Sequence, residues 1–296
     1  MRFFKSNRHN DISEVSTADD DAVERIDNQY PDDYPEYEGE YEPEQSKRHK
    51  KLKKIILRLL FLCFLLIAVN VFVLFFTGKL WFNQPDKDEY PIRGALVDSA
   101  MGEINWKTFS HQNIKVAYIR ATKGTGFKDE SFDQNWKNSS ECNLMTGAYH
   151  VFSLKKNGRE QAEYFCNALD TSFSGRIVPA VQVKLSGIDM ILAPDKADVI
   201  KHLKEFTDYF EQNFDISPLI ICDNRSYEKY IEADFKSCPI MITDYFSTPD
   251  DDIEWDFWCF NPRVRLKGYK NSKQYISMFV CGQNISTDDF KEKYLC

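Results

Sequence analysis

A long apolar stretch near the N-terminus constrains this chain more than any other feature. Across residues 55–77 only Arg58 and Asn70 interrupt it. About 20 such residues let a helix cross a bilayer, where backbone groups must find their hydrogen bonds within the helix. Arg58 lies near the start of the stretch, from which a long basic side chain can reach the headgroups. We therefore predict a transmembrane helix over residues 55–82.

The flanks of the apolar stretch predict its orientation. The basic sequence KRHKKLKK, residues 47–54, precedes it, and basic residues favour the cytoplasmic side. Trp81 and Phe82 follow it and suit the opposite membrane interface. A cleaved signal peptide is the rival interpretation, but about 50 hydrophilic residues come first and no small-residue cleavage site follows. We expect a single-pass protein of the cell membrane, with its N-terminus cytoplasmic and its C-terminal part extracellular.

Residues 1–54 have a composition unlike that of the rest of the chain. Residues 11–45 contain fourteen acidic residues and one basic residue, Arg25. Aliphatic residues are nearly absent, so this segment buries too little surface to offset its chain entropy. We predict a disordered acidic cytoplasmic tail that ends in the basic cluster. Either it is solvated without a specific partner or it binds a protein partner.

After a polar linker at residues 83–91, residues 92–296 read as one domain of alternating strands and helices. Strand-like segments such as IRGALVDSA, IKVAYIRAT and IVPAVQVKL alternate with amphipathic segments such as GREQAEYFCNAL. The last strand-like segments, PIMITDY, DFWCF and YISMFV, follow one another without helices. This order predicts an α/β fold, a parallel barrel whose last part lacks helices. In such barrels the binding groove lies at the carboxyl ends of the strands.

Cysteine and histidine spacing bears on disulfides and metals. Seven of the eight cysteines lie in residues 92–296, and an exported domain can hold disulfides. We predict two pairs, Cys222 with Cys238 and Cys259 with Cys281; because seven is odd, at least one thiol is free or paired between chains. The chain has no CxxC motif and no Cys/His spacing of a zinc site. We expect neither a metal nor another cofactor, and no nucleic-acid partner.

Six segments of this domain carry a family resemblance. They are RGALVDSAMGEINW, KVAYIRATKGTGFKDESFDQNW, TGAYHVFS, EQAEYF, SPLIICD and WDFWCF. In order and spacing they resemble glycoside hydrolase family 25, over residues 93–295. These muramidases (lysozymes) cut the bond between N-acetylmuramic acid and N-acetylglucosamine in peptidoglycan. The resemblance implies a flattened TIM-like barrel of the (β/α)5(β)3 type, with a groove lined by carboxylates and aromatic residues.

The sequence departs from the family at its carboxylate positions. Aligned without gaps, the family's first Asp falls on Leu96, and the Asp of its late Asp-x-Asn falls on Ser277. Its Pro-x-x-Asp-x-Glu, which supplies the principal catalytic pair, has Gln182 and Lys184 here. Its Ala-Thr-Glu-Gly has Lys123 in place of Glu. The resemblance therefore implies a site that has lost its acids.

Glycoside hydrolysis needs one carboxylic acid to protonate the leaving oxygen and a second carboxylate to act on the other side of the sugar. An amide cannot titrate, and an ammonium puts positive charge beside developing positive charge. We therefore predict a catalytically inactive lysozyme-like domain, a pseudoenzyme that binds peptidoglycan or another wall-associated partner. One alternative is an active muramidase with a relocated acid, Asp98 first and Asp189 or Asp244 at strand ends. The other is a structural or signalling ectodomain without glycan binding.

Several other side chains are candidates for contact with a glycan. Tyr149, Tyr245, Trp258 and Phe260 could stack on sugar faces. Lys123 and Lys184 could bind an anionic group such as a muramyl carboxylate. We interpret His150 as a hydrogen-bonded strand residue rather than a catalyst.

Overall fold

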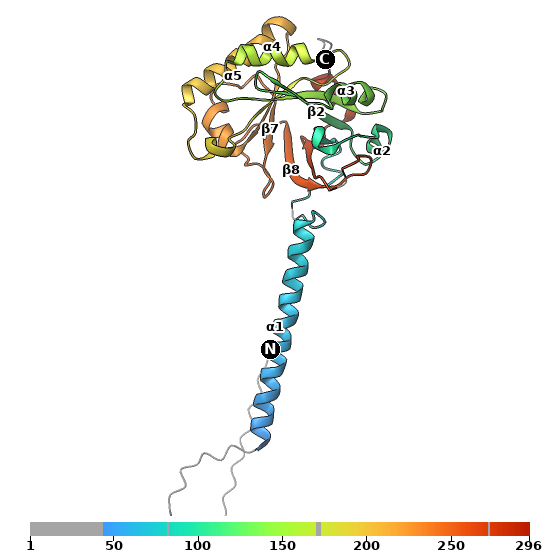
Figure 1. The fold of residues 1–296 in the computed structure, drawn as a ribbon, viewed down its shortest axis with the longest axis vertical. Coiled ribbons are helices and arrows are strands. Elements are labelled where there is room, and N and C mark those ends of the chain that lie inside the picture. The colour runs from blue at the N-terminus through green and yellow to red at the C-terminus, as the bar shows by residue number, and fades with distance from the viewer. Residues whose placement is uncertain (1–43, 82, 170–172, 272) are drawn as a thin grey trace, which may run out of the picture. The chain divides into compact units, whose positions relative to one another are not determined.

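A computed structural model describes residues 44–81, 83–169, 173–271 and 273–296 (Figure 1). The chain divides into two compact units, Met1–Leu59 and Leu60–Cys296. Most of the predicted acidic tail, residues 1–43, lies outside the described residues, and so does Phe82.

The first helix, α1 (Glu44–Phe76), contains residues 55–76 of the predicted span 55–82, but it begins earlier and ends earlier than predicted. An 18-residue window within it has a mean hydropathy of 3.0 and is entirely unburied, so the helix is long and apolar enough to cross a membrane. Residues 47–54, which we predicted as part of a disordered tail, are helical. The prediction was wrong there because this segment is rich in good helix formers and Arg48 pairs with Glu44 one turn earlier.

The described strands form one sheet that closes on itself. They are β1 (Arg93–Val97), β2 (Val116–Lys123), β3 (Phe127–Lys128), β4 (Met145–Val151), β5 (Ala180–Val183), β6 (Leu219–Asp223), β7 (Ile240–Thr243), β8 (Phe257–Val264) and β9 (Ile276–Cys281). Their order is β1-β9-β8-β7-β6-β5-β4-β2-β3, and β1 also pairs with β2. Pairing is parallel from β1 through β2 and β4 to β8, whereas β9 is antiparallel to both β8 and β1. The predicted α/β barrel is confirmed.

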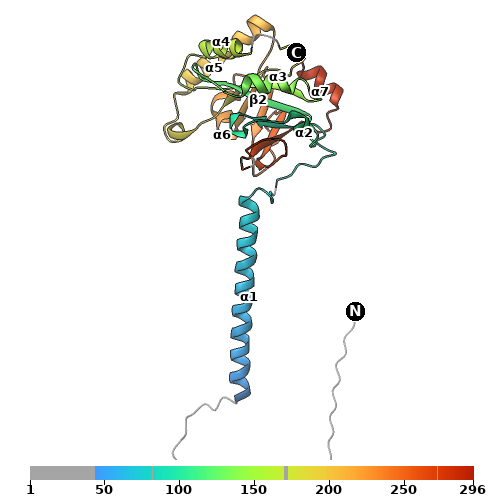
Figure 2. The ribbon, with the colours of Figure 1, turned by 45° about the vertical axis from the view of Figure 1, so that its right-hand side comes forward.

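Helices cross over between the parallel strands on the outside of the sheet (Figure 2). They are α2 (Trp106–Ser110), α3 (Phe132–Ser139), α4 (Gly158–Ala168), α5 (Lys196–Phe214) and α6 (Asn224–Ser226), which continues into the π-helix Tyr227–Ile231. Two short 3-10 helices, Ser99–Met101 and Gly187–Met190, follow β1 and β5. Such right-handed crossovers are what parallel strand pairing requires.

A last helix, α7 (Thr287–Tyr294), follows β9 and was not predicted. Ser286 caps it by accepting a hydrogen bond from the Asp289 amide at 3.1 Å. Phe290 and Tyr294, one turn apart, are buried against Phe257 at the start of β8. The helix therefore covers the barrel at the amino ends of its parallel strands. The other residues of α7 are polar, so the sequence analysis missed this helix. The signal was the spacing of Phe290 and Tyr294 after the capping residue Ser286.

Side chains alternate between two apolar layers along each strand. On β5, Ala180 belongs to a cluster inside the barrel, whereas Val181 and Val183 belong to a cluster between the barrel and the helices. Residues at i and i+2 of a strand share a face. The face of any strand residue therefore follows from its neighbours two positions away.

The predicted disulfides are wrong, because all eight cysteines are free thiols in the structure. Cys222 pairs across the sheet with Ile242, and Cys238 lies four residues before Ile242. Cys238 lies outside β7, which begins at Ile240, so the strand register does not bring it opposite Cys222. Cys259 and Cys281 lie on adjacent strands but face Phe279 and Phe257 respectively, not each other.

Close packing of α4 on α5 generates a prediction at Gly158. A Cβ there would lie 1.6 Å from the backbone oxygen of His202, and the Gly158 amide donates to Glu205 Oε2 at 3.1 Å. Gly158→Ala should lower the free energy of unfolding by about 2 kcal/mol, because the two helices must separate. Thermal unfolding of the detergent-solubilised chain measures this. Gly126→Ala is the matched control, since no atom lies within 4 Å of its Cβ position; equal melting temperatures for the two variants would contradict the prediction.

Candidate functional site

The carboxyl ends of the parallel strands form one end of the barrel, which we call the mouth. Leu96 on β1 lies directly opposite Ser277 on β9, and the interior cluster includes or contacts Leu96, Tyr149, Tyr245 and Cys259. Alternation from Ala180 extends the interior face of β5 to Gln182 and then to Lys184. The side chains on the interior face at the mouth are Leu96, Asp98, Arg120, Lys123, Tyr149, Gln182, Lys184, Asp223, Tyr245, Cys259 and Ser277.

A bulge in β2 brings two basic residues to this face. Arg120 pairs with Tyr149, but the register then shifts, and Lys123 pairs with Val151. Tyr149 and Val151 both point into the barrel. The extra residue therefore puts Arg120 and Lys123 on the same face although they are three positions apart.

Asp98, the carboxylate that the sequence offered as a relocated acid, belongs to an ion-pair network. Arg120 Nη1 lies 3.0 Å from Asp98 Oδ2, and its Nη2 lies 2.7 Å from Asp129 Oδ2. Asp98 Oδ1 also accepts a hydrogen bond from the Ala100 amide at 2.9 Å, which caps the 3-10 helix after β1. The Asp129 side chain is only 1% exposed. Asp98 thus lies at the mouth, but it is bound by a guanidinium and an amide.

The other two acids proposed as rescues are also engaged. Asp189 Oδ1 lies 2.7 Å from Lys155 Nζ. Burial acts to raise the pKa of Asp244, but hydrogen bonds from the amides of Ser247 and Phe246 and from two side chains outweigh it and hold the pKa below its usual value. A carboxylate held ionised in this way is a poor proton donor.

Asp223 is the carboxylate that the sequence reasoning missed. Val183 pairs with Cys222, so Lys184 and Asp223 come next to each other at the ends of β5 and β6. Asp223 Oδ1 accepts a hydrogen bond from the Ser226 amide at 2.8 Å and caps α6. LIIC is an unbroken apolar run, so the sequence held no signal for the face; in the structure Leu219 and Ile221 belong to the interior cluster, and Asp223 shares their face. Only Oδ1 of Asp223 takes part in this cap, so its Oδ2 does not cap the helix.

Gln182 and Lys184 lie at the mouth at the end of β5. Gln182 is half-buried and pairs with Val151 on β4 and Ile221 on β6. Lys184 is exposed, and its charge acts on the buried thiol of Cys259. Burial raises the pKa of that thiol to about 12, and Lys184 opposes the rise. An amide and an amine, rather than two carboxylates, therefore occupy this part of the interior face.

The four aromatic candidates divide between two faces. Tyr149 and Tyr245 face the interior, burial raises the pKa of both hydroxyls, and Tyr245 hydrogen-bonds Ser277. Trp258 and Phe260 lie on the other face of β8 and are 2% and 4% exposed. The Trp258 indole donates to the Asp244 carbonyl at 2.8 Å. The prediction that these two rings meet a glycan was wrong, since alternation about Cys259 turns both away from the interior.

His150 is fully buried on the outer face of β4. Its Nδ1 lies 2.7 Å from Thr122 Oγ1, its Nε2 lies 3.2 Å from Gln161 Oε1, and its ring stacks on Phe206. Burial lowers the pKa of His150 to about 4. It is a neutral histidine of the core, away from the mouth.

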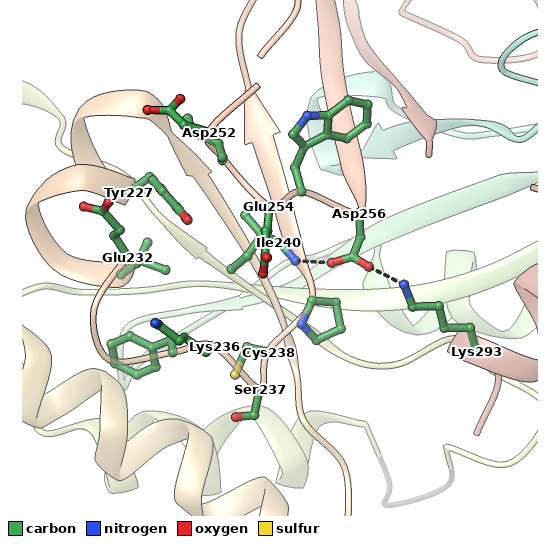
Figure 3. A pocket seen from close by; sticks show the side chains of 15 residues that line it. Tyr227, Glu232, Lys236, Ser237, Cys238, Ile240, Asp252, Glu254, Asp256 and Lys293 are labelled. Atoms are coloured by element: carbon green, nitrogen blue, oxygen red, sulfur yellow. Dashed lines mark hydrogen bonds and ion pairs between the residues drawn. The ribbon is translucent and has the colours of Figure 1, made fainter. Parts of the chain in front are cut away.

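A cavity of about 750 Å³ lies at the opposite end of the barrel, where β7 and β8 begin (Figure 3). Asp256 on its wall accepts from the Ile240 amide at 2.9 Å, from Lys293 at 2.7 Å and from the Tyr294 hydroxyl at 2.7 Å. A carboxylate with this many donors holds structure together. Because active sites of such barrels lie at the carboxyl ends of the strands, we take the mouth, not this cavity, as the candidate site.

The charges at the mouth are balanced and none of them marks a metal centre. Arg120, Lys123 and Lys184 face Asp98, Asp129 and Asp223. Within the described part of the chain, no group of three His, Cys, Asp or Glu side chains is placed to hold a metal ion.

Comparison with known proteins gives consistent results. The model of the family described as "Glycosyl hydrolases family 25" matches residues 97–269. The protein YegX of Escherichia coli K12 is 27% identical over 191 residues, which are 60% of this chain and 66% of that protein. Lysozyme M1 of Streptomyces globisporus is 34% identical over 96 residues, 32% of this chain and 33% of that protein. The chain thus matches less than two thirds of the length of either relative.

Among solved structures, a family 25 glycosyl hydrolase from Bacillus anthracis is similar in fold, with a TM-score of 0.66 and 29% sequence identity. The match covers 72% of this chain and 98% of that one. The likeness therefore extends over the whole of that domain.

The Arg120 network predicts a large cost when its cation is removed. Arg120→Ala should lower the free energy of unfolding by about 3 kcal/mol, because it leaves the buried Asp129 carboxylate without its counter-charge. Chemical denaturation of the detergent-solubilised chain measures the change. Arg159→Ala is the control: it breaks an exposed pair with Glu163 and should cost less than about 1 kcal/mol. Similar losses in both variants would argue against a structural role for the network.

Proposed function

This chain belongs to glycosyl hydrolases family 25, and from that premise we propose a membrane-anchored lysozyme-like domain that binds peptidoglycan without cleaving it. One observation carries the proposal. The interior face of β5 ends in Gln182 and Lys184, the positions to which the family motif assigns the catalytic acids. The lysozyme among its relatives favours peptidoglycan as the ligand.

The chemistry of the mouth supports inactivity. Loss of a general acid alone removes a factor of roughly 10²–10⁴ in rate. Asp98 is bound to Arg120 and Asp244 is held ionised, so neither offers a proton to a leaving oxygen. Lys184 would add positive charge next to an oxocarbenium-like transition state, which disfavours it.

The same side chains support retained binding. Lys123 and Lys184 are exposed cations on the interior face, and a muramyl carboxylate is an anion of matching charge. Tyr245 is half-buried on the same face, whereas Tyr149 is only 5% exposed. With Trp258 and Phe260 turned away and Tyr149 buried, Lys123, Lys184 and Tyr245 are our proposed glycan contacts.

We also assign the barrel to the (β/α)5(β)3 type and α1 to a membrane span. Helices follow β1, β2, β4, β5 and β6, whereas β7, β8 and β9 succeed one another directly. The basic segment before the apolar run supports a cytoplasmic N-terminus and a barrel on the outside. A cleaved signal sequence is the alternative for α1.

An active muramidase is the second candidate function, and Asp223 is the observation that favours it. This half-buried carboxylate lies next to Lys184 at the mouth, and only one of its oxygens caps α6. A single carboxylate with a free oxygen is fewer than the pair that hydrolysis uses. We therefore rank this function below glycan binding.

Hydrolysis is tested by incubating the full detergent-solubilised chain with purified peptidoglycan and measuring soluble muropeptides. We expect no release above a blank without protein. Release that disappears in Asp98→Asn or Asp223→Asn, with folding unchanged, would make the chain an active muramidase. Because these variants remove only charge and proton, they separate catalysis from packing.

Binding is tested by sedimentation of the same chain with insoluble peptidoglycan. We expect retention, and Lys184→Glu should weaken it about fivefold because it reverses the charge that faces the glycan. Lys291→Glu, an equally exposed change on α7 at the other end of the barrel, is the control. No retention of the unaltered chain would favour an ectodomain without glycan affinity.

A further inference from the structure

Loops around the mouth expose large apolar side chains. The connection from β5 to α5 presents Met190, Ile191 and Leu192, which are 56%, 82% and 66% exposed. The connection from β7 to β8 presents Phe246, which is 70% exposed. Exposed apolar side chains that gather on one end of a domain mark an interaction surface. The glycan proposal uses none of them.

Basic residues surround the apolar loop. Arg225 Nη1 donates to the Met190 carbonyl at 3.2 Å, and Lys155 pairs with Asp189 in the same turn. Lys184 is exposed at the end of β5, whereas Lys156, beyond β4, donates to Thr125 Oγ1 at 3.0 Å in the turn after β2. Apolar tips among exposed cations are typical of surfaces that rest on anionic lipid.

The segment that follows α1 is attached to this same end of the barrel. Trp81, predicted to lie at the membrane interface, is instead 6% exposed, and its indole donates to the Phe260 carbonyl at 3.0 Å. Phe260 follows the last pair of β7 with β8, so it lies at the mouth end. Asn83 Nδ2 donates to the Ser247 carbonyl, in the loop that carries Phe246, at 3.0 Å.

Chain length then limits how far the mouth can lie from the end of α1. The helix ends at Phe76, and Trp81 is five residues later. Five residues span at most about 17 Å. Within the unit Leu60–Cys296, the Tyr275 hydroxyl also donates to the Phe76 carbonyl at 2.9 Å. The mouth, rather than the α7 end of the barrel, is therefore tied to the end of the apolar helix.

We propose that the loops around the mouth rest on the outer surface of the bilayer that α1 crosses, with anionic phospholipid as the partner. Ile191 and Leu192 enter the headgroup region, and Arg225 and Lys155 contact lipid phosphates. The inference rests on the membrane anchoring proposed above and not on glycan binding. In this orientation the mouth opens at the bilayer surface.

The test places the full chain in nanodiscs that hold one copy each. Amide hydrogen exchange of the loop containing Asp244 and Phe246 is followed by mass spectrometry in phosphatidylcholine with phosphatidylglycerol, and in phosphatidylcholine alone. We expect about fivefold slower exchange in the anionic discs. The double variant Ile191→Asp, Leu192→Asp should remove this protection without any change in the peptide that is measured. Leu295→Asp, an exposed apolar residue of the C-terminus, is the control and should leave it intact.

Equal exchange in the two lipid compositions overturns the proposal. So does protection that appears only in discs with two copies, which would make the apolar loop a contact between chains. Alkaline carbonate extraction of membranes tests the anchoring separately. A chain that is released shows that α1 is not a span, whereas a retained chain with unprotected loops refutes only the lipid contact.

Discussion

Closure of the sheet is the constraint on which the rest of this structure depends. β1 pairs with β2 on one side and with β9 on the other, so no strand of the ring has a free edge except where β3 extends β2. Closure divides every strand into an interior and an exterior face. It also brings Leu96 opposite Ser277, although 181 residues separate them along the chain. The composition of the mouth is a consequence of that register.

Electrostatics at the mouth follow from one cation in the middle of two carboxylates. Arg120 lies between Asp98 and Asp129, and Asp129 in turn accepts a hydrogen bond from the Ser99 amide that fixes the turn after β1. The network joins β1, β2 and the segment after β3. A group that neutralises an acid and holds a turn in place suits a scaffold, whereas a glycosidase needs carboxyl groups that can exchange protons.

The segment after α1 is attached to the mouth end of the barrel through Trp81. Trp81 packs in the domain and not at a membrane interface because its indole donates to the carbonyl of Phe260, a buried residue within β8. A buried tryptophan with a satisfied N–H is a firm anchor. The attachment fixes which end of the barrel lies nearest to the apolar helix. The lipid contact proposed above explains why an exposed loop residue such as Ile191 is apolar.

The sequence by itself determined the barrel class and the apolar span, because hydrophobic periodicity is a local property of the chain. It located Gln182, Lys184, Leu96 and Asp98 by motif spacing alone. It misplaced Trp258 and Phe260, because a short aromatic run such as FWCF does not reveal which residues face inward.

Only the tertiary structure decided what the charged groups do. The sequence left open whether Asp98 is a free acid, and the structure shows that Arg120, from another strand, pairs with it. Asp223 became a candidate residue only because the strand register brings it next to Lys184. Cys222 and Cys238 likewise remain free thiols because of the pairing register of β6 with β7, which cannot be read from the sequence. The physical reason is the same in each case: ion pairs, hydrogen bonds and burial depend on distances between segments far apart in sequence, and those distances are set by closure of the barrel.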